Sequence, residues 1–157
     1  MHPVERMTSI AAADGFTCAI TLSGAAWCWG RNDYGQLGDG GPKARAMPAR
    51  VLIPEEVVLT EISAGGLHAC ARSIAGELWC WGSNRWGQLA SAPDMGAHRP
   101  ERLMGGVGRV AAGGNFTCAL LEPSRDVLCW GENEDGQLGR GESGGVHPVP
   151  ARVQNLP

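Results

Sequence analysis

The chain has 157 residues, of which 16 are acidic and 13 are basic, and its formal net charge is −3. Nucleic-acid binders need clustered positive charge to displace counterions from phosphate, so this mixed and slightly acidic composition argues against direct DNA or RNA binding. No apolar run reaches the roughly 18 residues that a membrane-spanning helix requires, which argues against a membrane span.

The first predicted element is a β-hairpin that contains Cys18 and Cys28. Short runs of apolar, β-branched and aromatic residues flank a polar turn with a glycine, and helical periodicity is missing. Facing residues of an antiparallel pair have a constant sum of residue numbers. If Cys18 faces Cys28, the turn is centred on Ser23, beside Gly24, which suits a tight hairpin.

The hairpin recurs twice along the chain. Cys70 facing Cys80 centres the second turn on Ala75, and one extra residue between Cys118 and Cys129 gives the third turn an even length. Side chains alternate faces along a strand, so the bulky neighbours of each second cysteine point away from it. Both faces of every sheet are therefore apolar, and we expect the sheets to be stacked against neighbours.

Each hairpin runs into the same phrase, Trp-Gly-x-Asn-x-x-Gly-Gln-Leu, whose tryptophan falls at positions 29, 81 and 130. A period of about fifty residues is typical of propellers and solenoids, in which each unit buries its apolar face against the next. We interpret the repeated positions as structural; they are Trp29, Gly30, Asn32, Gly35, Gln36, Leu37, Trp81, Gly82, Asn84, Gly87, Gln88, Leu89, Trp130, Gly131, Asn133, Gly136, Gln137 and Leu138.

A Pro-x-Arg piece links the units at residues 48–50, 100–102 and 150–152, and residues 3–7 are a degraded copy of it. Cutting the chain at this piece gives a single propeller-type domain over 1–157, with repeats at approximately 4–47, 48–99 and 100–149. Residues 150–157 are then expected to start or complete a strand of a further blade.

The repeated phrase resembles the signature of the regulator of chromosome condensation repeat, and the resemblance covers nearly the whole chain. It implies an all-β fold of four-stranded antiparallel blades in a β-propeller, which in this family has about seven blades. Three repeats form an open arc, a fragment of a longer propeller, or one part of a ring completed by oligomerisation, in which two copies give six blades.

Six cysteines, two per repeat in one register, indicate a common role. Opposite residues in a close antiparallel pair have the separation that a disulfide spans. We predict three such bridges: Cys18–Cys28, Cys70–Cys80 and Cys118–Cys129. Small buried hydrophobic thiols in a reducing cytosol are the alternative. The intervals do not match the short paired spacing of zinc ribbons, so no metal is expected.

The cysteine pairs favour an extracellular or cell-envelope location, because disulfides persist mainly in oxidising compartments. The first residues lack the charged-then-apolar plan of a signal peptide, so a cytoplasmic location stays open. An exported protein requires that the given sequence begins downstream of such a peptide.

No catalytic constellation emerges from the sequence. The histidines lie at unrelated positions, and His68 occupies a repeat position that holds Phe16 and Phe116 elsewhere, which indicates packing. A photoreceptor of the resembled family uses the tryptophan of a Gly-Trp-Arg-His-Thr motif as its chromophore. The matching positions here are Asp14, Gly66 and Gly114. We therefore expect no enzyme activity, no cofactor and no light-sensing tryptophan cluster.

The variable pair inside the phrase is the best candidate for a binding surface. The pair reads Asp-Tyr in the first repeat, Arg-Trp in the second and Glu-Asp in the third, so the fold does not dictate it. Binding residues accumulate on loops of rigid β scaffolds, and Tyr and Trp are enriched in interaction hot spots. We therefore predict a contact surface formed by Tyr34, Arg85 and Trp86.

These observations favour a non-catalytic scaffold that binds a protein partner. The resemblance implies an alternative, a guanine nucleotide exchange factor or regulator of a small GTPase, although no inserted hairpin and no basic tail are present. A glycan-binding propeller is the second alternative. The partner's identity does not follow from these residues.

Overall fold

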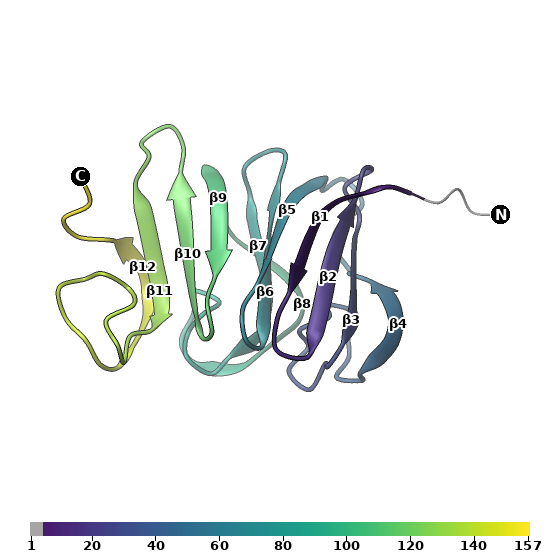
Figure 1. The fold of residues 1–157 in the computed structure, drawn as a ribbon, viewed down its shortest axis with the longest axis horizontal. Helices are drawn as coiled ribbons and strands as arrows, with labels where there is room; N and C mark the ends of the chain where they lie inside the picture. Colours follow the sequence, from purple (N-terminus) through teal and green to yellow (C-terminus); the bar gives the residue numbers. More distant parts are fainter. Residues whose placement is uncertain (1–4) are drawn as a thin grey trace.

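The computed structural model describes residues 5–157 as three four-stranded antiparallel sheets, each formed by one continuous stretch of chain (Figure 1). The first sheet contains β1 (Met7–Ala12), β2 (Phe16–Thr21), β3 (Ala26–Gly30) and β4 (Arg45–Arg50). The second contains β5 (Leu59–Ala64), β6 (His68–Ser73), β7 (Leu78–Asn84) and β8 (Asp94–Met104). The third contains β9 (Val107–Ala112), β10 (Phe116–Leu121), β11 (Val127–Glu132) and β12 (Val146–Arg152). The predicted all-β fold of four-stranded blades is confirmed.

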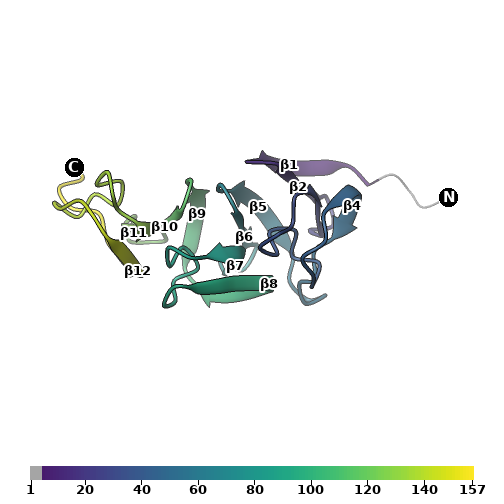
Figure 2. The same ribbon diagram turned by 90° about the horizontal axis from the view of Figure 1, so that it is seen from below.

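The three blades stand side by side in a row, with the two ends of the described chain at opposite ends of the row (Figures 1 and 2). Strands follow sequence order within every blade, and β1 lies against β5 and β5 against β9. Within residues 5–157 there is no fourth sheet, so the row is not closed into a ring. Nothing in this part of the chain forms a helix long and apolar enough to cross a membrane.

The Pro-x-Arg piece ends a blade. Residues 48–50, 100–102 and 150–152 lie in β4, β8 and β12, which pair with β3, β7 and β11 as the fourth strands of their sheets. Strands of the three blades therefore span 7–50, 59–104 and 107–152, a different phase from repeats cut at 48 and 100. Residues 150–152 complete the third blade rather than begin a further one. Residues 3 and 4 of the degraded copy at 3–7 lie outside the described residues, and its last residue, Met7, begins β1.

All three predicted disulfides are present, because each hairpin places its two cysteines directly opposite one another. The α-carbons of every pair are 4.1 Å apart. The bridges are Cys18–Cys28, Cys70–Cys80 and Cys118–Cys129. Each bridge ties together the two central strands of its blade.

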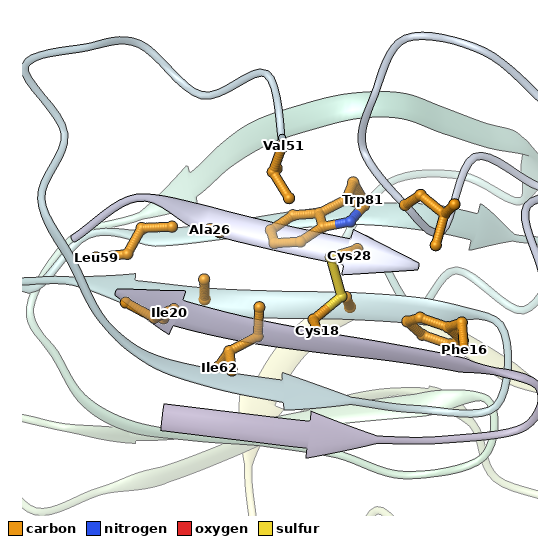
Figure 3. Packing of buried hydrophobic residues seen from close by; sticks show 12 residues of the cluster. Phe16, Cys18, Ile20, Ala26, Cys28, Val51, Leu59, Ile62 and Trp81 are labelled. Carbon is orange, nitrogen blue, oxygen red and sulfur yellow. A yellow bond between two sulfur atoms is a disulfide. The ribbon is translucent and has the colours of Figure 1, made fainter. Parts of the chain in front are cut away.

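Each blade has a disulfide face, which carries its bridge, and a tryptophan face, which carries Trp29, Trp81 or Trp130. The disulfide face of one blade packs against the tryptophan face of the next, and we call this contact a seam. In the first seam Trp81 lies beside the Cys18–Cys28 bridge, in a cluster of buried apolar side chains (Figure 3). The indole N–H of Trp81 donates a hydrogen bond of 2.9 Å to the backbone carbonyl of Gln36 in the first blade. The apolar contact is therefore held in one register by a directional bond.

The second seam repeats this arrangement. Trp130 packs with the Cys70–Cys80 bridge and donates its indole N–H to the backbone carbonyl of Gln88, at 2.9 Å. The hydroxyl of Thr117 donates to the same carbonyl, also at 2.9 Å. Trp81 and Trp130 are fully buried, which identifies these tryptophans as the centres of the two seams.

His68 is buried in the second seam. Its Nε2 lies 2.9 Å from the hydroxyl oxygen of Thr117, whose proton is already donated to Gln88, so Nε2 carries the hydrogen and Nδ1 is unprotonated. Burial lowers the pKa of His68 to about 4, and the ring is therefore neutral at pH 7. The predicted packing role of this position is confirmed.

Removing one disulfide should destabilise the protein. Replacing both Cys18 and Cys28 by alanine is expected to lower the free energy of unfolding by about 3 kcal/mol, because the bridge constrains the unfolded chain and its sulfur atoms fill the first seam. Urea denaturation followed by tryptophan fluorescence measures the difference. An unchanged midpoint and slope would show that the bridge adds no stability.

His68 should make the stability fall as the pH is lowered. The folded-state pKa of about 4 lies below the ordinary value of 6.5, so the unfolded chain binds the proton first and stability is lost from about pH 6.5 downward. The loss should reach about 3 kcal/mol at pH 4. The variant His68→Phe carries the residue of the other two repeats. It should not show the loss of stability due to His68 protonation, whereas any loss due to protonation of carboxylates should remain. Identical pH profiles for the two proteins would contradict the assignment.

Candidate interaction surface

The loops after β3, β7 and β11 are held by the asparagine of the repeated phrase. The side-chain oxygen of Asn84 accepts the backbone N–H of Leu89 at 2.9 Å, and its amide nitrogen donates to Ser91 and to the carbonyl of Ala92. Asn32 and Asn133 accept from the leucines of their own loops at 3.0 and 3.1 Å. All three asparagines are fully buried, so they shape the loop and are not accessible to a ligand.

The glutamine of the phrase holds the variable pair. The side-chain oxygen of Gln36 accepts the backbone N–H of Tyr34 at 2.9 Å, and Gln88 does the same for Trp86 at 2.9 Å. The backbone carbonyls of these glutamines accept the seam tryptophans. The phrase therefore fixes the backbone of the variable pair and leaves its side chains free to differ.

Charged groups brace the first of these loops. Asp39 accepts hydrogen bonds from the side chains of Arg45, at 2.8 Å, and Asn32, at 3.0 Å, and from the backbone N–H of Gly41. Burial by itself would raise the pKa of Asp39, but these donors hold it below its ordinary value. The carboxylate is thus ionised and serves the loop's own structure.

The structure brings Tyr34 and Arg85 together across the first seam. The guanidinium carbon of Arg85 lies 4.7 Å from the centre of the Tyr34 ring, which is cation–π geometry. Tyr34 is half-buried and Arg85 is exposed, while Trp86, the next residue, is half-buried. We call Tyr34, Arg85 and Trp86 the variable-pair surface. It combines two aromatic side chains with a cation whose N–H groups remain open to solvent.

The third loop carries a different chemistry at the same positions. Glu134 and Asp135 are exposed, and Glu134 accepts the backbone N–H of Gly145 in its own loop. No aromatic or basic side chain stands at this pair. The third loop therefore has the same two positions without the side-chain types of the variable-pair surface.

Two residues beside this surface were not expected from the sequence. A methyl group added at Gly35 would lie 2.6 Å from the α-carbon of His98, and one added at Gly87 would lie 2.9 Å from that of Pro148. Strands β8 and β12 therefore cross closely over the loop of the preceding blade. The sequence contains one indication of this close approach, because His98 and Pro148 occupy equivalent repeat positions, each four residues before the arginine of a Pro-x-Arg piece.

The loops before β2, β6 and β10 border a shallow, open hollow lined by small residues. Asp14, Gly66 and Gly114, the positions of the tryptophan motif, lie on this lining with Ala13, Gly65 and Gly113. Such a lining has little to orient a small molecule, because Asp14 is its one ionisable side chain.

Models of the regulator of chromosome condensation (RCC1) repeat match this chain over most of its length. One model matches residues 23–72, 75–120 and 126–157, and a second model of the repeat matches residues 7–36, 59–88 and 109–137. The chain belongs to this repeat family. Three RCC1 repeats thus account for the three blades, for their seams and for the loops that carry the variable pairs.

Curated relatives share the RCC1 repeats with this chain. The Ultraviolet-B receptor UVR8 of Arabidopsis thaliana is 33% identical over 98 residues, which are 62% of this chain and 22% of the receptor. The human E3 ubiquitin-protein ligase HERC2 is 35% identical over 108 residues, which are 66% of this chain and 2% of the ligase. The chain therefore spans less than a quarter of either relative.

Solved structures show the same fold. Human WBSCR16 superposes with a TM-score of 0.85 at 23% identity, over 96% of this chain and 38% of that one. Prp20p of Saccharomyces cerevisiae superposes with a TM-score of 0.84 at 24% identity, over 94% of this chain and 38% of that one. The likeness establishes the RCC1-type propeller blades for this chain.

The loop network predicts a large cost for removing Asn84. The variant Asn84→Ala should lower the free energy of unfolding by about 3 kcal/mol, because it leaves the buried N–H of Leu89 and other loop groups without partners. The exposed variant Arg85→Ala should cost about 1 kcal/mol at most. Chemical denaturation of both variants tests this, and equal costs would contradict the division between structural and free positions.

Proposed function

We propose that this chain is a non-catalytic scaffold that binds a protein partner through the variable-pair surface of Tyr34, Arg85 and Trp86. The observation that carries the proposal is the stacking of Arg85 on Tyr34 at positions that the loop's own hydrogen bonds leave free. The neighbouring positions of the phrase are buried in the loop network. The variable pair is thus where the repeats can acquire specificity without altering the fold.

The chemistry of this surface fits a protein partner better than a small molecule. Arg and the aromatic residues are the side chains enriched at binding hot spots, and a cation stacked on a ring keeps its N–H donors in position for a carboxylate. We expect the partner to place an acidic side chain on Arg85 and an apolar one on Trp86. Relatives agree with this role in part: Prp20p has binding properties to Gsp1p and histones, and yeast RCC1 has been crystallised with Kap60 bound.

The variant Arg85→Ala/Trp86→Ala tests the proposal. A photo-crosslinking residue at the exposed position 33, which leaves Tyr34, Arg85 and Trp86 unchanged, should first capture the partner in cells that express the protein. The purified partner should then bind the double variant at least tenfold more weakly, because truncation of a hot-spot residue costs about 2 kcal/mol or more.

The third loop supplies the matched control. The variant Glu134→Ala/Asp135→Ala changes the same two positions of the same turn, and it should leave the affinity unchanged. Equal weakening by both variants, or no weakening by the first, would rule out the variable-pair surface as the contact. Thermal unfolding of both variants shows whether the blades remain intact.

The alternative activities are tested with the same preparation. A scaffold should not accelerate release of fluorescent GDP from a small GTPase, whereas an exchange factor should do so at catalytic concentrations. A glycan-binding propeller should retain a defined oligosaccharide class on a glycan array in a manner sensitive to loop substitutions. Either positive result would replace the protein-scaffold proposal.

Three disulfides support a place of action in an oxidising compartment, outside the cell or in the cell envelope. Blocking free thiols immediately on lysis and counting alkylated cysteines by mass spectrometry tests this location. Six protected cysteines support it, and six alkylated ones place the protein in a reducing compartment.

A further inference from the structure

The two end faces of the row are the two halves of one seam. Inside the chain, each seam joins a disulfide face to a tryptophan face, and both seams use the same register positions. No described blade covers the tryptophan face of the first blade. No described blade covers the disulfide face of the third blade.

The exposed tryptophan face carries the side chains that a seam buries. Ile10 lies opposite Ala19 in the strand register, as Ile62 lies opposite Ala71 and Val110 opposite Ala119. Ile62 and Val110 are 5% and 7% exposed in the seams, whereas Ile10 is 69% exposed. Met7 is 57% exposed where its counterparts are 2% exposed, namely Leu59 and Val107. Within residues 5–157, the apolar side chains that a seam would bury are therefore exposed on the first blade.

The disulfide face of the third blade is open in the same way. Phe116 is partly exposed, although its counterparts Phe16 and His68 are buried in the first and second seams. Leu120 is partly exposed where Ile20 is fully buried. This face retains the Cys118–Cys129 bridge on which the indole of a following blade would lie.

The polar groups of the two faces also match. In the second seam the carbonyl of Gln88 accepts the indole N–H of Trp130 and the hydroxyl of Thr117. The first blade carries Trp29 and Thr17 at these two donor positions, since both sit opposite each other in its hairpin. The third blade carries Gln137 at the acceptor position, and its side chain holds the loop as Gln88 does.

We propose that a second copy of this chain docks head to tail, with the third blade of one copy against the first blade of the other. The contact reproduces the internal seam: Phe116 and the Cys118–Cys129 bridge cover Trp29 and Ile10, and the carbonyl of Gln137 accepts from Trp29 and Thr17. The occupant is a copy of this chain because the two faces complete each other. One face carries the tryptophan, the threonine and the apolar strand residues of a seam, and the other carries the bridge and the glutamine carbonyl. The proposal does not depend on the variable-pair surface.

A head-to-tail contact uses two different faces, so it is heterologous. If the rotation between blades permits, two copies close into a ring of six blades. Otherwise the contact adds further copies and produces longer assemblies. Wild-type protein should therefore have a mass by light scattering of at least twice the 16.5 kDa of one chain.

Two variants, each with one face disabled, provide the decisive test. Ile10→Asp places a charge on the tryptophan face, and Phe116→Asp places one on the disulfide face. Each variant alone should be monomeric, because its remaining good face meets only a disabled one. Mixed in equal amounts, they should form a one-to-one dimer through a single intact seam.

The control is Ile74→Asp in the middle blade, which changes the same residue type at 72% exposure and should keep the wild-type mass. Met7→Asp serves as a second disabled tryptophan face if Ile10→Asp fails to fold by circular dichroism. A monomeric wild type, an assembly that survives in either variant, or a mixture that stays monomeric would overturn the proposal.

Discussion

Every part of this structure depends on one constraint, which is that each sheet is apolar on both faces and must be covered by another sheet. A disulfide occupies one face and a tryptophan the other, so covering both requires the bridge of one blade to meet the indole of the next. The hydrogen bonds from Trp81 to Gln36 and from Trp130 to Gln88 add direction to that contact. Burial alone would permit sliding, since apolar contact has no preferred register.

The seam also explains why the loops are so uniform. A loop carbonyl can accept the indole N–H of the next blade only if the loop has a fixed conformation. The buried asparagine and glutamine of the phrase fix that conformation through their hydrogen bonds. Gln36 shows both functions at once, because its carbonyl accepts Trp81 while its side chain accepts the N–H of Tyr34. The fold therefore restricts the phrase but not the variable pair, whose side chains differ in chemistry among the repeats.

The sequence predicted most of the fold because its decisive relations are local. The pairing of Cys18 with Cys28 follows from counting along one hairpin, and the two-sided apolar pattern of Trp29 and its neighbours indicates stacking. Prediction of the blade limits was weaker, since a period can be cut at any phase and only the pairing of β4, β8 and β12 shows where a sheet ends. The use of Tyr34, Arg85 and Trp86 in binding stays a prediction from the sequence, whereas the stacking of Arg85 on Tyr34 did not follow from it. Tyr34 and Arg85 are distant in sequence, and their contact depends on the offset between adjacent blades, which no local pattern encodes. His98 and Pro148 escaped prediction for the same reason, because they approach the loop of another blade across a seam.

This offset links the variable-pair surface to the seam beneath it. Tyr34 belongs to the first blade and Arg85 to the second, so the stacked pair has its geometry only while Trp81 keeps the two blades in register. A partner that contacts both side chains binds the stacked blades and not a single blade. Its binding free energy then adds to the stability of the first seam, since a ligand stabilises the state that it binds. Under the proposed function, partner binding and blade stacking are coupled through the buried indole of Trp81.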